Sequence, residues 1–231
     1  MSANTTQDKQ DFRVKAAREK REKMRARLLD ATLEIYQPND KGPEAVIDDV
    51  VKKAGVSRGT FYKYFDSLDE AIESLGEHLA DDMLRSYETI FSESLEDSAY
   101  LAGGTVITLA RAAMEPRWGI FISHVDFINH LSDQRSLSDI VTKPLLEGKH
   151  QGLLHFTAIE AAADMLIGAT VEATKRLAHG QQQNQAYILE VAQCCMQGLG
   201  MDQKNAKQSA TTAWQRLKEH QKQLSWWQEL L

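Results

Sequence analysis

Residues 54–65, which read AGVSRGTFYKYF, constrain the fold more than any other part of this chain. Gly55 stands just beyond a helical pattern over 45–53, and glycine readily adopts the left-handed conformation found after a helix C-terminus. Ser57 follows two residues later, and its hydroxyl is a good acceptor for the first amides of a new helix. The segment therefore predicts two short helices that meet at a tight turn, a helix-turn-helix.

The second of these helices has two different faces. Phe61 and Phe65 are four residues apart, share one face and are expected to pack inward. The remaining positions carry hydrogen-bond donors or let a backbone come close: Arg58, Gly59, Thr60, Tyr62, Lys63 and Tyr64. This division suits a helix that lies in the major groove of DNA, where arginine can bind a guanine edge or a phosphate. The alternative is a helical corner whose polar residues are only solvated.

Charge is distributed unevenly along the chain. The formal net charge of the 231 residues is −6, yet residues 1–65 carry 14 lysines and arginines against 10 acidic residues. Eight basic residues fall between Arg13 and Arg27, against only two glutamates. We interpret this stretch, including Arg18 and Arg21, as a basic arm that follows the DNA backbone or the minor groove. The alternative is a solvated, charged helix.

The hydrophobic pattern is helical throughout, and no strand-like alternation occurs. The fold class is therefore predicted to be all-α, with an N-terminal helix-turn-helix domain and a C-terminal helical domain. Residues 1–12 are expected to be disordered. The predicted domains are a flexible basic arm over 1–20, a DNA-binding domain over 21–75, an effector-binding and dimerisation domain over 76–202, and an additional C-terminal helix over 203–231. Their helices are expected over 14–36, 45–53, 57–65, 68–92, 99–114, 117–131, 135–147, 158–178, 184–198 and from 203 onward.

The predicted helix over 117–131 is the candidate ligand-binding element. It combines a wide apolar surface with a few polar groups, a composition that suits a small hydrophobic ligand. The candidate ligand-binding residues are Trp118, Phe121, Ile122, His124, Val125, Phe127 and Ile128, together with Met165. An ordinary core helix is the alternative. His124, Asp126 and His130 do not follow a ligand spacing typical of metal sites, so neither a metal nor another cofactor is expected.

Other sequence features exclude several classes of protein. Cys194 and Cys195 are adjacent, which suits buried thiols in a reducing cytoplasm better than a disulfide framework or a redox sensor. No apolar run approaches the roughly 20 residues that span a bilayer, so no membrane association is expected. No nucleophile–base pair or phosphate-binding loop appears, so the protein is not expected to be an enzyme.

The helix-turn-helix resembles the TetR family of bacterial transcription regulators over about residues 20–75. The resemblance includes the apolar spacing of the first helix around Leu29, and it rests more specifically on five short motifs. These are Asp49-Val50, Ala54-Gly-Val-Ser57, Gly59-Thr-Phe-Tyr62, Tyr64-Phe65 and Leu68-Asp-Glu-Ala71. Val46 and Leu68 stand where the family often has threonine and lysine that contact phosphate.

The resemblance implies a symmetric homodimer whose recognition helices enter successive major grooves of a palindromic double-stranded DNA operator. It maps the family's DNA contacts onto Arg58, Gly59, Thr60, Tyr62, Lys63 and Tyr64. It implies a dimer interface made by the helices over 158–178 and 184–198, and a small hydrophobic effector that releases a repressor from DNA. A regulator switched by a protein partner, or an activator, with no small-molecule effector, is the alternative.

Overall fold

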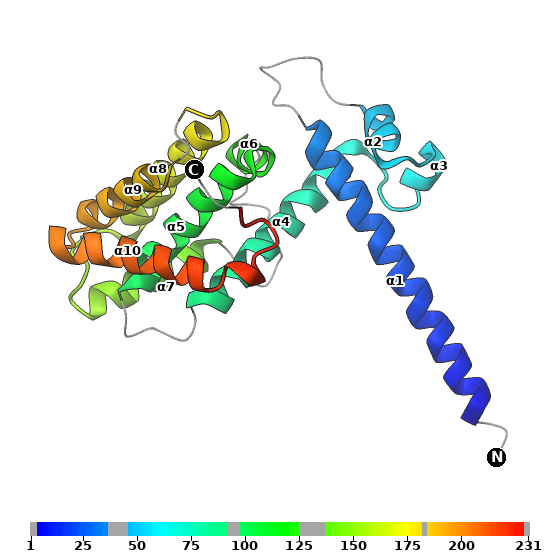
Figure 1. Cartoon of the computed structure of the whole chain (residues 1–231), viewed down its shortest axis with the longest axis horizontal. Helices are drawn as coiled ribbons and strands as arrows, with labels where there is room; N and C mark the ends of the chain where they lie inside the picture. The colour runs from blue at the N-terminus through cyan, green and yellow to red at the C-terminus, as the bar shows by residue number, and fades with distance from the viewer. Residues whose placement is uncertain (1–3, 37–45, 92–97, 125–136, 182–183, 229–231) are drawn as a thin grey trace. The chain divides into compact units, whose positions relative to one another are not determined.

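The structure is a computed structural model that describes residues 4–36, 46–91, 98–124, 137–181 and 184–228. Within these ranges every regular element is helical and no strand occurs, so the all-α prediction is confirmed (Figure 1). The chain divides into two compact units, Met1–Leu75 and Gly76–Leu231. None of the described helices is long and apolar enough to cross a membrane.

The first unit contains α1 (Asn4–Ile35), α2 (Ile47–Ala54), α3 (Arg58–Phe61) and the start of α4 (Leu68–Phe91). The expectation of disorder over residues 1–12 is wrong from Asn4 onward because α1 begins there, so the basic arm is helical from the same residue. The chain has neither glycine nor proline before Pro38, and alanine, lysine, arginine, glutamate and glutamine are frequent in the stretch. These residues have high intrinsic helix propensity.

The turn between α2 and α3 has the predicted geometry. Gly55 adopts φ 63° and ψ 42°, and its amide donates to the carbonyl of Lys52 at 3.2 Å. The hydroxyl of Ser57 accepts the Thr60 amide at 3.2 Å and so caps α3. A Cβ at Gly55 would lie 2.9 Å from the guanidinium of Arg27, so α1 approaches this turn closely.

A small core holds the first unit together. Its members come from the four helices and from the segment between α3 and α4, and they are at most 2% exposed: Leu28, Leu29, Val50, Ala54, Phe61, Phe65, Ala71 and Leu75. The rings of Phe61 and Phe65 lie 5.6 Å apart between centroids. Both aromatics are buried as predicted, but the predicted helix over 57–65 is too long, since α3 ends at Phe61 and turns cover residues 62–64.

The second unit is arranged around α5 (Ala99–Met114), which is buried along almost its whole length. The rest of α4 and the later helices belong to the same unit, and α6, α7, α8, α9 and α10 all contact α5 (Figure 1). Their bounds are Pro116–His124 for α6, Leu137–His150 for α7, Ile159–Ala178 for α8, Gln185–Gly198 for α9 and Gln203–Glu219 for α10.

The approach of α6 to its neighbours depends on the absence of a side chain. A Cβ at Gly119 would lie 2.9 Å from the Cβ of Ala178 on α8 and 3.1 Å from the Cβ of Ala112 on α5. Both distances are shorter than packed carbon atoms normally adopt, so glycine at 119 and alanines at 112 and 178 let three helices meet closely.

The end of the chain differs from the predicted helix over 203–231. Helix α10 ends at Glu219, a short 3₁₀ turn covers Gln221–Gln223, and Leu224 is extended. The chain then folds back so that the Trp227 ring lies 5.7 Å from that of Trp214 on α10. Because Trp226 is only 3% exposed, burial of these rings favours the turn over a continued helix.

Candidate nucleic-acid interface and effector site

The donors predicted to contact DNA lie together on one surface of the first unit. Arg58, Gly59, Tyr62 and Lys63 are exposed, and Thr60 and Tyr64 are half-buried. Tyr62 is 51% exposed, unusual for an aromatic residue next to a core. We call these six residues the α3 surface. The structure brings all of them together, and their contact with DNA stays a prediction.

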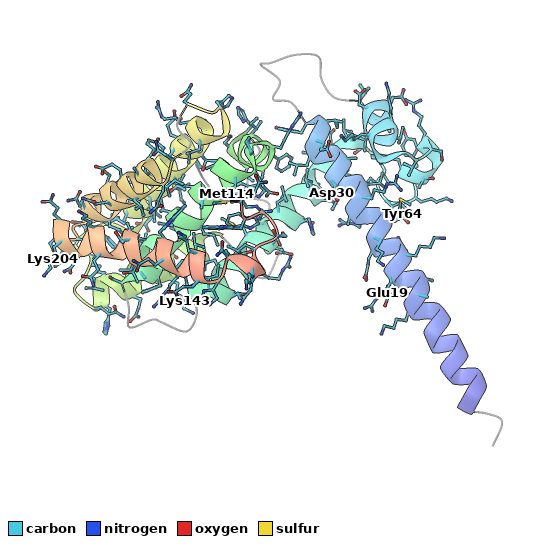
Figure 2. The ribbon with its side chains drawn as sticks, viewed as in Figure 1. Glu19, Asp30, Tyr64, Met114, Lys143 and Lys204 are labelled. Carbon is cyan, nitrogen blue, oxygen red and sulfur yellow. The ribbon has the colours of Figure 1, made fainter. Side chains whose placement is uncertain are left out.

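Helix α1 contributes cations beside this surface. The guanidinium of Arg21 lies 6.0 Å from the ring centroid of Tyr64, and that of Arg25 lies 5.4 Å from the ring centroid of Phe65. Tyr64 is labelled in Figure 2. Arg21 is therefore next to the α3 surface, as a DNA-contacting arm requires. Arg18 is also exposed, but its Nε donates to Glu22 at 3.1 Å within the same helix. Part of its charge is thus balanced by its own helix.

Sequence reasoning missed a partner of Arg58. The Nε of Arg58 donates to Oδ1 of Asp48, in the first turn of α2, at 2.7 Å. Both side chains are largely exposed, at 61% and 62%. The neighbouring Asp49 has a different role, since its Oδ2 accepts the amide of Val46 at 3.3 Å. The available signal was a carboxylate at the start of α2 and an arginine at the start of α3, with only a short turn between the helices.

The residues predicted to bind an effector separate into three groups. Trp118, Phe121 and Ile122 on α6 are 1%, 0% and 8% exposed and belong to the core of the second unit. His124 is exposed, and its Nδ1 lies 2.8 Å from the carbonyl oxygen of Ile120. Met165 is 39% exposed on α8, with its sulfur against Gly198 of α9. Val125, Phe127 and Ile128 lie outside the described residues.

A charged group inside the second unit was also missed from the sequence. Arg111 on α5 is 6% exposed, and its guanidinium donates to Asp82 of α4 at 2.7 Å and to Glu115 at 2.9 Å. The same group lies 4.8 Å from the ring centroid of Trp118 and 5.7 Å from that of Trp226. Arg111 therefore joins α4, α5, α6 and the C-terminal turn.

The C-terminal turn has a second attachment to α5. The amide of Gln228 donates at 3.3 Å to the sulfur of Met114, which lies at the end of that helix and is labelled in Figure 2. Together with the contact between Arg111 and Trp226, this bond connects the last described residues to the centre of the unit.

The second unit also holds buried donors. The indole nitrogens of Trp118, Trp214, Trp226 and Trp227 are inaccessible and have no hydrogen-bond partner within the described ranges. A buried donor without an acceptor is unfavourable, so an acceptor-bearing molecule would gain from reaching one of them. Across the same ranges, no three or more histidine, cysteine or acidic side chains are grouped as a metal site requires.

The two helices predicted to form a dimer interface have both buried and exposed small residues. Ala162, Ala163 and Ala173 of α8 are buried in the unit's own core. The exposed small or apolar residues of α8 include Ala161, Met165, Gly168 and Ala169. A Cβ at Gly168 would meet nothing within 4 Å, so another helix has space to approach there.

The adjacent cysteines of α9 differ in their surroundings. Cys195 is buried, but Cys194 is exposed, so the prediction of two buried thiols is wrong for Cys194. Burial raises the pKa of the Cys195 thiol to about 11, so this thiol is protonated and unreactive near neutral pH.

The family model and the sequence relative match only a minor part of the chain. Residues 28–75 match the family model described as "Bacterial regulatory proteins, tetR family". An uncharacterized HTH-type transcriptional regulator, YvdT of Bacillus subtilis (strain 168), is 43% identical over 54 residues, which is 23% of this chain and 27% of that protein. The matched segment thus spans only about a quarter of that relative.

Solved structures extend the likeness to most of the chain. RolR in complex with the ligand resorcinol is 22% identical with a TM-score of 0.60, covering 84% of this chain and 95% of that one. The fatty acid degradation regulator FadR from Bacillus halodurans is 18% identical with a TM-score of 0.66, covering 77% and 97%. A gamma-butyrolactone receptor (ArpA-like) is 17% identical with a TM-score of 0.56, covering 86% and 98%. At these identities the likeness establishes a shared fold.

Proposed function

We propose that this chain, whose residues 28–75 match the tetR family of bacterial regulatory proteins, is a cytoplasmic transcriptional regulator that binds a palindromic operator as a homodimer and is released by a small effector. The observation that carries this proposal is the α3 surface, where donors are exposed while Phe61 and Phe65 anchor the helix from behind. A recognition helix needs this combination of a fixed scaffold and solvent-accessible polar side chains.

DNA binding is tested first, with DNA selected from a random library by the purified protein. Arg58→Ala and Lys63→Ala are expected to weaken binding to the selected site by at least about tenfold in a gel-shift titration. Lys207→Ala, which removes an exposed lysine from α10, is the matched control and is expected to leave affinity unchanged. Equal affinity of all these variants and the wild type would refute the role of the α3 surface.

Salt dependence provides an independent test. Each phosphate contact that a substitution removes should reduce the slope of log affinity against log salt by about 0.9, because fewer counterions are released. We expect this change for Lys63→Ala and for Arg21→Ala, whose guanidinium lies beside Tyr64. An unchanged slope for both would contradict the backbone contacts.

The effector is expected to bind in the second unit. The folds of RolR with resorcinol, of a gamma-butyrolactone receptor and of a fatty acid regulator support phenols, lactones and fatty acids as the first probes. All four tryptophans lie in the second unit, so quenching of tryptophan fluorescence reports binding there. A probe that quenches fluorescence but leaves operator affinity unchanged would refute effector release.

One observation favours a second candidate, a regulator switched by a protein partner or an activator without a small effector. Trp118 and Phe121 fill the interior of the second unit and are almost completely buried. An interior filled by side chains leaves little space for a ligand. Absence of quenching by every probe, combined with intact DNA binding, would support this candidate.

A further inference from the structure

We propose that Asp48 is a positioning residue for DNA recognition, holding Arg58 so that its outer edge reads a guanine in each half-site. The inference rests on the proposed function, because it assigns a role to a residue beside the α3 surface. The Nε of Arg58 lies 2.7 Å from Oδ1 of Asp48.

Which nitrogen of the Arg58 guanidinium contacts Asp48 decides which nitrogens remain available to a base. Arginine has five N–H donors in a planar fork, one on Nε and two on each terminal nitrogen. A carboxylate on Nε leaves both terminal nitrogens available, and these make the bidentate contact with O6 and N7 of guanine. Asp48 therefore occupies an edge of Arg58 that base recognition does not need.

The local fold fixes the distance between the two residues. Asp48 lies in the first turn of α2, and Arg58 is the first residue of α3. The left-handed Gly55 and the capping Ser57 define the turn between these helices. Since both backbones are held, the ion pair selects the direction of an arginine side chain that solvent alone would leave free to rotate.

The exposure of the pair indicates that its role is not stability. At 61% and 62% exposure, such an ion pair contributes little to folding. A carboxylate near DNA also repels phosphate, so Asp48 should weaken non-specific binding. Removing Asp48 is thus predicted to reduce base preference without reducing non-specific affinity.

The test uses the full-length protein and the site that it selects from random DNA. Each base pair of one half-site is replaced in turn, and dissociation constants are measured for wild type, Asp48→Asn, Arg58→Ala and the double variant. We expect Arg58→Ala to reduce guanine preference at one base pair by roughly 5- to 150-fold. Asp48→Asn should reduce that preference by at least about fivefold, while non-specific binding stays equal or becomes tighter.

The double variant shows whether Asp48 acts through Arg58. We expect Asp48→Asn to leave base preference unchanged when Arg58 is already alanine. Asp69→Asn, which removes an exposed carboxylate from the first turn of α4, is the charge-matched control and should leave base preference unchanged. Circular dichroism of each variant checks that the helices are retained.

Several results would overturn the proposal. A change in preference below about twofold for Asp48→Asn, or a stronger preference, would mean that Asp48 does not orient Arg58 for base reading. An equal reduction in the Arg58→Ala background would mean that Asp48 contacts a base itself. Full base preference in Arg58→Ala would show that Arg58 reads no base. A wild-type protein that selects no DNA sequence would instead refute the proposed function.

Discussion

Replacing Arg111 by methionine tests whether the buried charge holds the second unit together. Methionine has a similar length and no charge, so it removes two ion pairs, with Asp82 and Glu115, and two contacts with tryptophan rings. Arg85→Met is a matched control, because Arg85 approaches the same Asp82 at 3.9 Å but is 62% exposed.

The size of the effect follows from the surroundings of each partner. Asp82 and Glu115 are 36% exposed, so water can solvate them after the change, and each broken pair costs about 1 kcal/mol. Each cation–π contact with Trp118 or Trp226 adds about 1 kcal/mol, and methionine restores part of the loss through apolar contact. We expect a net loss of about 3 kcal/mol, against less than about 0.5 kcal/mol for Arg85→Met.

Urea unfolding followed by tryptophan fluorescence measures this loss in the correct unit. All four tryptophans belong to the second unit, so unfolding of the first unit does not contribute directly to the signal. With a slope of about 2 kcal/mol/M, the midpoint for Arg111→Met should fall by roughly 1.5 M. Protein concentration is held constant, because dimerisation would add to apparent stability.

Two outcomes would refute the reasoning about Arg111. A loss below about 1 kcal/mol for Arg111→Met would mean that the network contributes no more than a surface ion pair. An equal loss for Arg85→Met would mean that the effect comes from the charge near Asp82 rather than from the buried contacts.

Three further perturbations have defined outcomes. Phe61→Ala, which empties a fully buried position, should destabilise the first unit by about 3–5 kcal/mol, seen as faster amide exchange in α2, while Tyr62→Ala should not. Gly55→Ala should cost about 1 kcal/mol or more in the same assay, because alanine disfavours φ 63°. Burial raises the pKa of Cys195 from 9.0 to about 11, so its contribution to stability is complete below pH 9 and declines as pH rises through 11. The urea midpoint of Cys195→Ala should therefore fall less than that of the wild type between pH 9 and pH 11. An equal fall in the two proteins would contradict a buried Cys195 thiol.

The first unit could be predicted well because local signals specify it. Gly55 and Ser57 each have one favourable role at a helix end, and Phe61 with Phe65 can share only one face. The same local signals failed at the chain ends. Polarity suggested disorder before residue 13, whereas helix propensity without glycine or proline gives α1. At the C-terminus, apolar spacing suggested a helix, whereas burial of Trp226 requires the chain to turn.

The ion pairs could not be predicted for a different reason. Arg111 and Asp82 are 29 residues apart, and nothing in periodicity reports which helices meet. Asp48 and Arg58 lie on different helices, and the sequence alone does not show that the turn at Gly55 brings their side chains together. Met165 was grouped with Trp118 by residue type, although one is exposed and the other buried.

The close meeting of α5, α6 and α8 at Gly119 has an evolutionary consequence. No side chain fits at 119 while Ala112 and Ala178 stay where they are, because the added carbon would lie 3.1 Å and 2.9 Å from their Cβ atoms. Substitutions at these three positions should therefore be inherited together, with a gain of volume at one compensated by a decrease at another. Across an alignment of relatives, their summed side-chain volume should vary less than three independent positions would allow.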